Sequence, residues 1–214
     1  MAEQTYKALG VLLTYPRQQL IDGLKSLGAA VDASKILPSE KKQALGELIT
    51  YLRETELLAL EEEYVGLFDR NPSLSLHLFE HIHGESRDRG QAMVNLHAMY
   101  KGKGIEIDGN ELPDFLPLFL EYLSLLEPKE AARLLGEAVD ILALIGRQLQ
   151  ERNSLYRCVF DALIALCDRT PSKEFLEKAI DRVNKENAAR DIDEEWKEPE
   201  AFCGKPCDQK GGKV

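Results

Sequence analysis

The four histidines of the chain all lie between residues 77 and 97. His77, Glu80 and His81 form the string His-x-x-Glu-His, which is the zinc motif of the inverted metallopeptidases. On a helix, two histidines four residues apart face one side and bind a metal, while the glutamate activates water. A third ligand must come from elsewhere, and Glu151 lies far enough downstream for that role. His83 offers another imidazole, but it faces a different side of a helix from His81. One interpretation is therefore a catalytic zinc site.

Two features of the chain count against a peptidase. Enzymes that carry this motif resemble large α/β proteins, whereas this chain is small and helical in pattern. Residues 71–75, which precede the motif, do not open a long helix, so the same-face geometry is not assured. Histidines that cap a turn or form hydrogen bonds across a helix interface are the favoured alternative.

The same block also has the composition of a recognition surface. Glu80, Glu85 and Asp88 supply acceptors, and Arg87 and Arg89 supply forked donors. Apolar residues are interleaved with them, namely Leu74, Leu76, Leu78, Phe79 and Ile82. This mixture suits a groove that holds a peptide, with apolar pockets for anchors and charges for register. The alternative is a solvated face whose ion pairs contribute under about 1 kcal/mol each.

The rest of the chain has helical periodicity. We expect helices at 3–15, 17–28, from 39 onward, 56–68, 86–100, from 110 or 114 onward, 128–152, 154–168 and 172–184. Gly28 is expected to end the second helix, and Pro128 to open the longest one. The predicted fold is all-α, a single-domain bundle of about eight to nine helices over residues 1–184. Residues 185–214 are predicted to be a disordered acidic tail.

Composition excludes several classes of function. The formal net charge of −10 leaves no broad basic field, so we expect no nucleic-acid partner. No apolar run approaches the roughly 20 residues that span a bilayer, so we expect no membrane insertion. The N-terminus lacks the pattern of a secretory signal, and the expected location is the cytoplasm. Cys158 and Cys167 lie in an apolar helical pattern typical of buried thiols. Cys203 and Cys207 form a weak C-x₃-C signal, and no resident metal or cofactor is expected.

Longer segments resemble a known family. The segments are Tyr64-Val-Gly-Leu-Phe-Asp-Arg70, Ser75 through Met93, and Glu111 through Leu123, with Leu12-Leu-Thr-Tyr-Pro16 and Trp196 through Phe202 near the ends. They are similar to the NarJ-type nitrate reductase assembly chaperones, also called the nitrate reductase delta subunit, within the TorD/DmsD redox-enzyme maturation family. The family's Pro-Asp-His pattern appears here as Pro113-Asp114-Phe115, so a histidine role at that position is lost.

The resemblance implies an all-helical cytoplasmic chaperone without catalytic activity. Such proteins bind the catalytic alpha subunit of respiratory nitrate reductase, at its N-terminal segment and at a second region. They permit molybdenum cofactor insertion, restrain premature membrane docking and can meet the cofactor insertion machinery. A chaperone for another molybdoenzyme is the near alternative, and the zinc peptidase is the enzyme alternative.

On this interpretation the client peptide lies as an amphipathic helix in a groove between helices. The predicted partner-binding residues are Tyr64, Phe68, Leu78, Phe79, Glu80, His81, His83, Glu85, Arg87, Asp88, Arg89, Asp114, Phe119, Glu121 and Tyr122. The apolar members would anchor the peptide, and the acidic members would meet its basic groups. The two arginines would fix its orientation, and His81 and His83 would make binding sensitive to pH. A helix-packing role fits each of the aromatic residues equally well.

Overall fold

The computed structural model describes residues 2–83, 87–107 and 111–183. Its labelled helices are α1 (Ala2–Leu12), α2 (Gln18–Asp32), α3 (Ser39–Glu54), α4 (Leu57–Tyr64), a π-helix (Val65–Asp69), a 3₁₀-helix (Pro72–Leu74), α5 (Leu78–His83), α6 (Arg87–Lys101), α7 (Leu116–Ser124), α8 (Pro128–Glu137), α9 (Val139–Glu151) and α10 (Arg157–Leu166). A further helix covers 173–183. Within these ranges the only β feature is a single antiparallel bridge between His77 and Phe115. The all-α prediction is confirmed.

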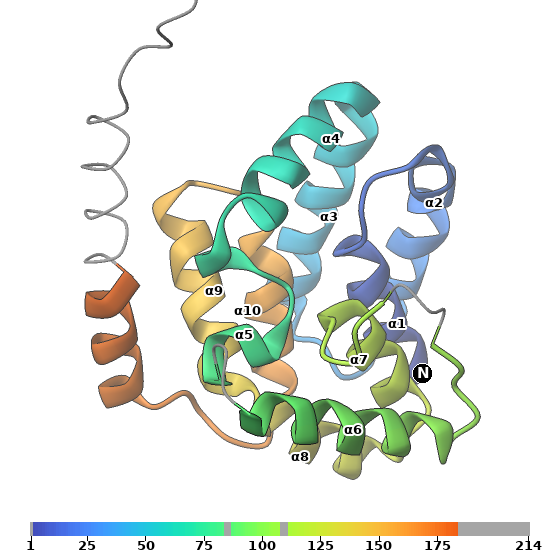
Figure 1. Cartoon of the computed structure of the whole chain (residues 1–214). Coiled ribbons are helices and arrows are strands. Elements are labelled where there is room, and N and C mark those ends of the chain that lie inside the picture. Colours follow the sequence, from blue (N-terminus) through green and yellow to red (C-terminus); the bar gives the residue numbers. More distant parts are fainter. Residues whose placement is uncertain (1, 84–86, 108–110, 184–214) are drawn as a thin grey trace, which may run out of the picture.

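The helices form one bundle around a shared core (Figure 1). Helices α9 and α10 pack together at the centre, and α3 packs against α10. Helix α1 lies along α7 on one side and is flanked by α2 on the other. Helix α6 runs across the lower edge of the view, next to α5 and in front of α8. The helix at 173–183 lies at the opposite edge from α2.

The apolar residues that give the helices their periodicity are buried. On α3 the stripe at positions 45, 48, 49 and 52 is in the core, and on α7 the stripe at 116, 119, 120 and 123 is too. Their three- and four-residue spacing places these side chains on one side of each helix, where burial of apolar surface stabilises the fold. Pro117 falls in the first turn of α7, where a missing backbone N–H does no harm.

The expected helix at 128–152 is instead two helices. The chain bends at Ala138, whose φ and ψ are −97° and 2°. The loop before the last helix occupies this bend: the Asp168 backbone N–H donates to the Ala132 carbonyl at 3.4 Å, and Arg169 Nε donates to the Gly136 carbonyl at 2.5 Å. The first acceptor lies within α8, and the second is one of the carbonyls of its last turn, which has no partner inside the helix. The periodic stripe continues through the bend, so spacing alone did not reveal it.

Two other expectations were wrong. Helix α2 runs through Gly28 to Asp32, because Gly28 takes an ordinary helical position rather than a left-handed one. Helix α5 was not predicted at all, and with the bend in 128–152 it explains why the described chain has more helices than the eight to nine expected. The π-helix after α4 contains the backbone bond from the Arg70 N–H to the Val65 carbonyl, at 3.0 Å.

A close approach joins α1 to α7. A Cβ atom at Gly10 would lie 3.2 Å from the Pro117 carbonyl oxygen and 3.3 Å from Leu120 Cβ. The absence of a side chain at this position lets the two helices cross closely. Tyr6, Leu9 and Leu12 of α1 are buried.

The predicted tail at 185–214 lies outside the described residues, and so does the domain boundary at 184 and 185; both stay predictions. Within the described ranges, no helix combines the length and apolar character needed to cross a bilayer.

Candidate functional site

The histidines of the zinc-like string make internal hydrogen bonds. His81, on α5, bonds through Nε2 to the backbone carbonyl of Ser75 at 2.8 Å, so Nε2 carries the proton. His77, just before α5, bonds through Nδ1 to Asp114 Oδ1 at 3.2 Å. Burial lowers the pKa of His81, although the Ser75 carbonyl opposes this shift. The described residues contain no cluster of three His, Cys, Asp or Glu side chains that could hold a metal ion. The string therefore serves local structure here.

Asp114 organises the entry to α5. It is 0% exposed, and its Oδ2 accepts the backbone N–H of Phe79 at 3.0 Å. Its backbone carbonyl accepts the N–H of Leu78, also at 3.0 Å. Phe115, which departs from the family's histidine, packs its ring on the His77 ring with centroids 5.4 Å apart and planes tilted by 34°. At the position where the family has a histidine, this chain therefore has a phenylalanine ring that contacts His77.

A groove opens between α5, α6, α7 and the α8–α9 bend, with a volume of about 370 Å³. Its lining residues are Leu78, Phe79, Ile82, Ala92, Asn95, Leu96, Met99, Phe119, Leu134, Glu137, Ala138 and Ile141. Ile82 is 55% exposed and Met99 is 38% exposed, so large apolar side chains face solvent at its edge. Three of the predicted anchors, Leu78, Phe79 and Phe119, meet here. An apolar cleft with few polar groups is the usual form of a binding site.

Two helical stripes border the groove with the same spacing. Ala92, Leu96 and Met99 lie four and three residues apart on α6, and positions 134, 138 and 141 repeat that spacing across the α8–α9 bend. None of these residues is among the predicted partner contacts. The signal was present in the spacing, but a stripe of this kind is also how a helix packs in a core.

Two acidic residues on the helices that form the groove pair with arginines, and one of them, Glu137, lines the groove. Glu80 accepts from Arg89 at 3.3 Å, and Glu137 accepts from Arg133 at 2.6 Å. Both pairs are partly exposed, so each stabilises the free protein only weakly. Asp88 is exposed on α6. A basic group on a ligand can therefore exchange with these arginines at small cost.

Other predicted contacts lie inside the bundle. Tyr64 and Phe68 are buried in a ring cluster with Tyr156, and Tyr64 Oη donates to the Leu13 carbonyl at 2.9 Å. Tyr122 is buried against Tyr100, with ring centroids 4.9 Å apart. Tyr64, Phe68 and Tyr122 do not line the groove, and their contact with a client stays a prediction.

The remaining predicted residues are separate from the groove or not described. Glu121 is exposed on α7 and pairs with Lys7 of α1 at 3.7 Å. Glu85 lies outside the described residues, as do the side chains of His83 and Arg87. The structure therefore brings Leu78, Phe79 and Phe119 together at the groove and pairs Glu80 with Arg89, and these residues are a subset of the predicted set.

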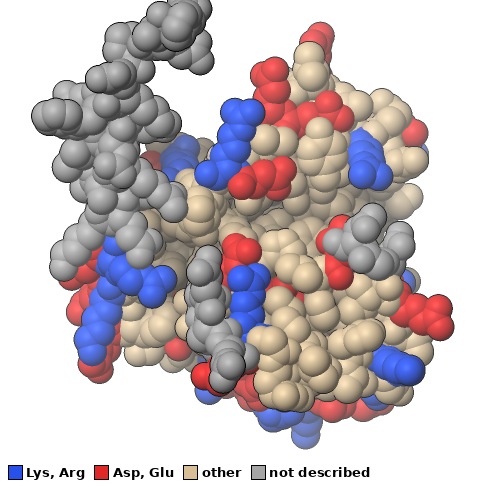
Figure 2. Space-filling view, viewed as in Figure 1, with Lys and Arg blue, Asp and Glu red and all other residues tan. Residues whose placement is uncertain are grey.

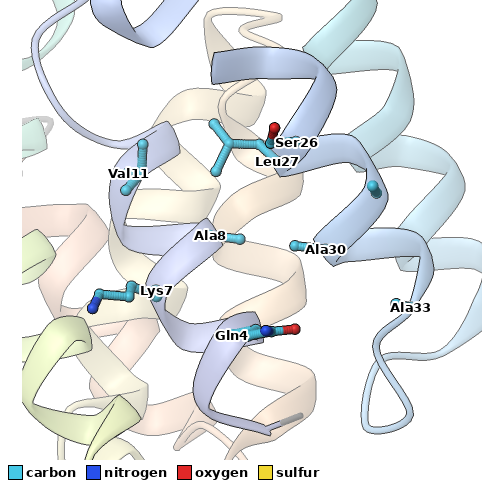
Figure 3. A pocket seen from close by; sticks show the side chains of 9 residues that line it. Gln4, Lys7, Ala8, Val11, Ser26, Leu27, Ala30 and Ala33 are labelled. Atoms are coloured by element: carbon cyan, nitrogen blue, oxygen red, sulfur yellow. The ribbon is translucent and has the colours of Figure 1, made fainter.

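A second hollow lies between α1 and α2 and has a larger volume, about 510 Å³ (Figure 3). Ala8 and Ala30 face each other across it, with Val11 and Leu27 at one end and Gln4 at the other. It is shallow because its walls are mostly small side chains, and it contains none of the predicted contacts. We prefer the groove at α5 and α6 because larger apolar side chains meet there and the acidic Glu137 lies beside them.

The charged side chains on the face shown in Figure 2 are interspersed, with acidic and basic groups next to one another over uncharged surface. The described part of this face has no broad basic area of the kind that follows a nucleic-acid backbone.

Comparison with known proteins identifies relatives over most of the chain. The family described as nitrate reductase delta subunit matches residues 35–162. The nitrate reductase molybdenum cofactor assembly chaperone NarJ of Escherichia coli (strain K12) is 40% identical over 92% of this chain and 84% of its own. The probable chaperone NarW of the same strain is 36% identical over 91% of this chain and 81% of its own. The probable NarJ of Bacillus subtilis (strain 168) is 26% identical over 82% and 95%.

Proposed function

This chain belongs to the nitrate reductase delta subunit family, and from that premise we propose that it is a chaperone that binds the immature catalytic alpha subunit of nitrate reductase. The relatives carry the name of nitrate reductase molybdenum cofactor assembly chaperones, which are not catalysts. The function of this chain is accordingly binding, and the His77-x-x-Glu80-His81 string has no catalytic part in it.

The observation that carries the proposal is the apolar groove at α5, α6, α7 and the α8–α9 bend. The N-terminal segment of the alpha subunit would lie there as an amphipathic helix. Its apolar side chains would pack between the two stripes of four-three spacing. The volume of about 370 Å³ falls in the range of roughly 300–1,000 Å³ that binding clefts have.

The acidic border gives the peptide its orientation. Glu137 lines the groove, and Glu80 on α5 and the exposed Asp88 on α6 belong to two of the helices that form it. Basic groups of the client would meet these carboxylates, while Arg89 and Arg133 would turn to solvent or to acidic groups of the client. Charge pairing of this kind changes register and association rate more than affinity.

While it is bound to the chaperone, the alpha subunit would remain accessible for molybdenum cofactor insertion and would not dock on the membrane prematurely. The cytoplasm is the compartment in which we expect this to happen. A second region of the alpha subunit would contact another surface of the chaperone, and the cofactor insertion machinery could join the complex.

Co-purification from cells that express the nitrate reductase tests the proposal. A tagged full-length chain is expected to retain the alpha subunit, identified by mass. Met99→Glu places a charge at the edge of the groove and is expected to release it. Val94→Glu is the matched control, because Val94 is also an exposed apolar residue of α6 but does not line the groove. Recovery of a different molybdoenzyme, or equal loss in both variants, would contradict the assignment.

A further inference from the structure

Helix α5 is too short to be stable by itself. It has six residues, Leu78–His83, whereas an isolated helix in water needs about 12–15 residues even for marginal stability. Yet it supplies Leu78, Phe79 and Ile82 to the groove. The direction of these three side chains must therefore be fixed by contacts from outside the helix.

Asp114 makes those contacts. Both oxygens of its buried carboxylate are used, Oδ2 by the Phe79 N–H at 3.0 Å and Oδ1 by His77 Nδ1 at 3.2 Å. The residue before α5 is His77, which is not one of the residue types that cap a helix well. Asp114 supplies the capping oxygen from 35 residues along the chain, and its negative charge suits a helix N-terminus.

The segment around Asp114 also forms hydrogen bonds that connect α6 and α7, which form the other walls of the groove. The Pro113 carbonyl accepts from Tyr100 Oη of α6 at 2.7 Å. The Leu116 N–H, at the start of α7, donates to the Leu76 carbonyl at 2.9 Å. One short segment thus joins α5, α6 and α7, and Phe119 of the groove is one turn further along α7.

We propose that Asp114 is a positioning residue for client binding: it does not touch the client, but its carboxylate fixes the first turn of α5 so that Leu78, Phe79 and Ile82 form one wall of the groove. The inference rests on the proposed function for the identity of the client. It replaces the prediction that Asp114 contacts the client directly. A displaced α5 would leave a buried carboxylate without its donors, which is strongly unfavourable, so one arrangement of the wall is selected.

Two substitutions of Asp114 separate positioning from folding. In Asp114→Asn the amide oxygen can still accept the Phe79 N–H, while the amide NH₂ can donate to His77 Nδ1 in its other tautomer. In Asp114→Ala both contacts are lost. Thr5→Val is the control, because it removes another buried hydrogen bond, from Thr5 Oγ1 to Ser34 Oγ at 2.8 Å. This bond joins α1 to the residues after α2, and neither partner lines the groove.

Hydrogen exchange without any client tests the positioning step. In the full-length chain, Asp114→Ala is expected to raise amide exchange over 78–83 by about tenfold, with Asp114→Asn close to the parent. Thr5→Val should leave exchange in this segment unchanged. Unaltered exchange in Asp114→Ala, or an equal rise in Thr5→Val, would overturn the inference.

Affinity for a synthetic peptide of the alpha-subunit N-terminal segment tests the second step. Asp114→Ala is expected to weaken Kd by about tenfold, with rescue by Asp114→Asn and no change in Thr5→Val. If Asp114→Ala bound the peptide with the affinity of the parent chain, the inference would be overturned, even if amide exchange over 78–83 had risen. A parent chain that does not bind the peptide would refute the proposed client instead, and the exchange measurement would still decide whether Asp114 positions α5.

Discussion

Truncation of Ile82 tests the contribution of the α5 wall to client affinity. This side chain lines the groove and is 55% exposed in the free protein. Complete burial of an isoleucine side chain is worth about 1.5–3 kcal/mol, so covering the exposed half is worth about 0.8–1.6 kcal/mol. Ile82→Ala removes most of that surface and should weaken the Kd of the alpha-subunit peptide by about 4- to 15-fold.

The assay is titration calorimetry of the N-terminal peptide against the full-length chain. Leu58→Ala is the matched control: Leu58 is 66% exposed on α4 and does not line the groove. Both variants should unfold within about 1 kcal/mol of the parent, since each removes mostly exposed surface. Parental affinity for Ile82→Ala, or an equal loss for Leu58→Ala, would refute the assignment of this wall to the client.

Three further predictions concern pH, packing and thiol reactivity. The hydrogen bond to Asp114 raises the pKa of His77, and burial opposes this rise. The bond to protonated His77 therefore adds stability that is fully present below the ordinary histidine pKa of about 6.5. This stability is lost as the pH rises through the higher pKa of His77 in the folded protein. Urea unfolding between about pH 6 and about 8 should show this decline in the parent but not in His77→Gln; parallel curves would refute it. Gly10→Ala should destabilise the α1–α7 crossing by about 1–3 kcal/mol in thermal denaturation, whereas Gly23→Ala, with open space around it, should not; equal melting temperatures would contradict this packing. Desolvation raises the pKa of the partly buried Cys158 to about 12, so its alkylation, followed by mass spectrometry, should be slow until the chain unfolds, and fast modification of the folded chain would contradict the raised pKa.

The fold was largely predictable because it depends on periodic burial. The helical periodicity predicted the helices that form α1, α3 and α7, and their apolar stripes are buried. The bend at Ala138 was not predictable, since it is stabilised by Arg169 from a distant loop and leaves the apolar period intact. Contacts between segments far apart in the sequence leave no local signal.

The groove was predictable only in part, for the same reason. Leu78, Phe79 and Phe119 were selected as apolar residues within recognisable motifs, and they do meet at one groove. Nothing in the local sequence distinguishes them from Tyr64 or Tyr122, which are equally aromatic or apolar but pack inside the bundle. The distinction depends on which neighbours cover each face, and only the assembled structure supplies it.

Site-specific crosslinking tests the central claim most directly. The alpha-subunit N-terminal peptide, with a photoreactive group on its apolar face, would be irradiated with the full-length chain, and the adducts located by mass spectrometry. If the peptide binds in the groove, adducts are expected at residues 78–82, 92–99 and 134–141, and an excess of unlabelled peptide should reduce their yield. Adducts confined to the α1–α2 hollow, or labelling no greater than with a scrambled peptide, would contradict it.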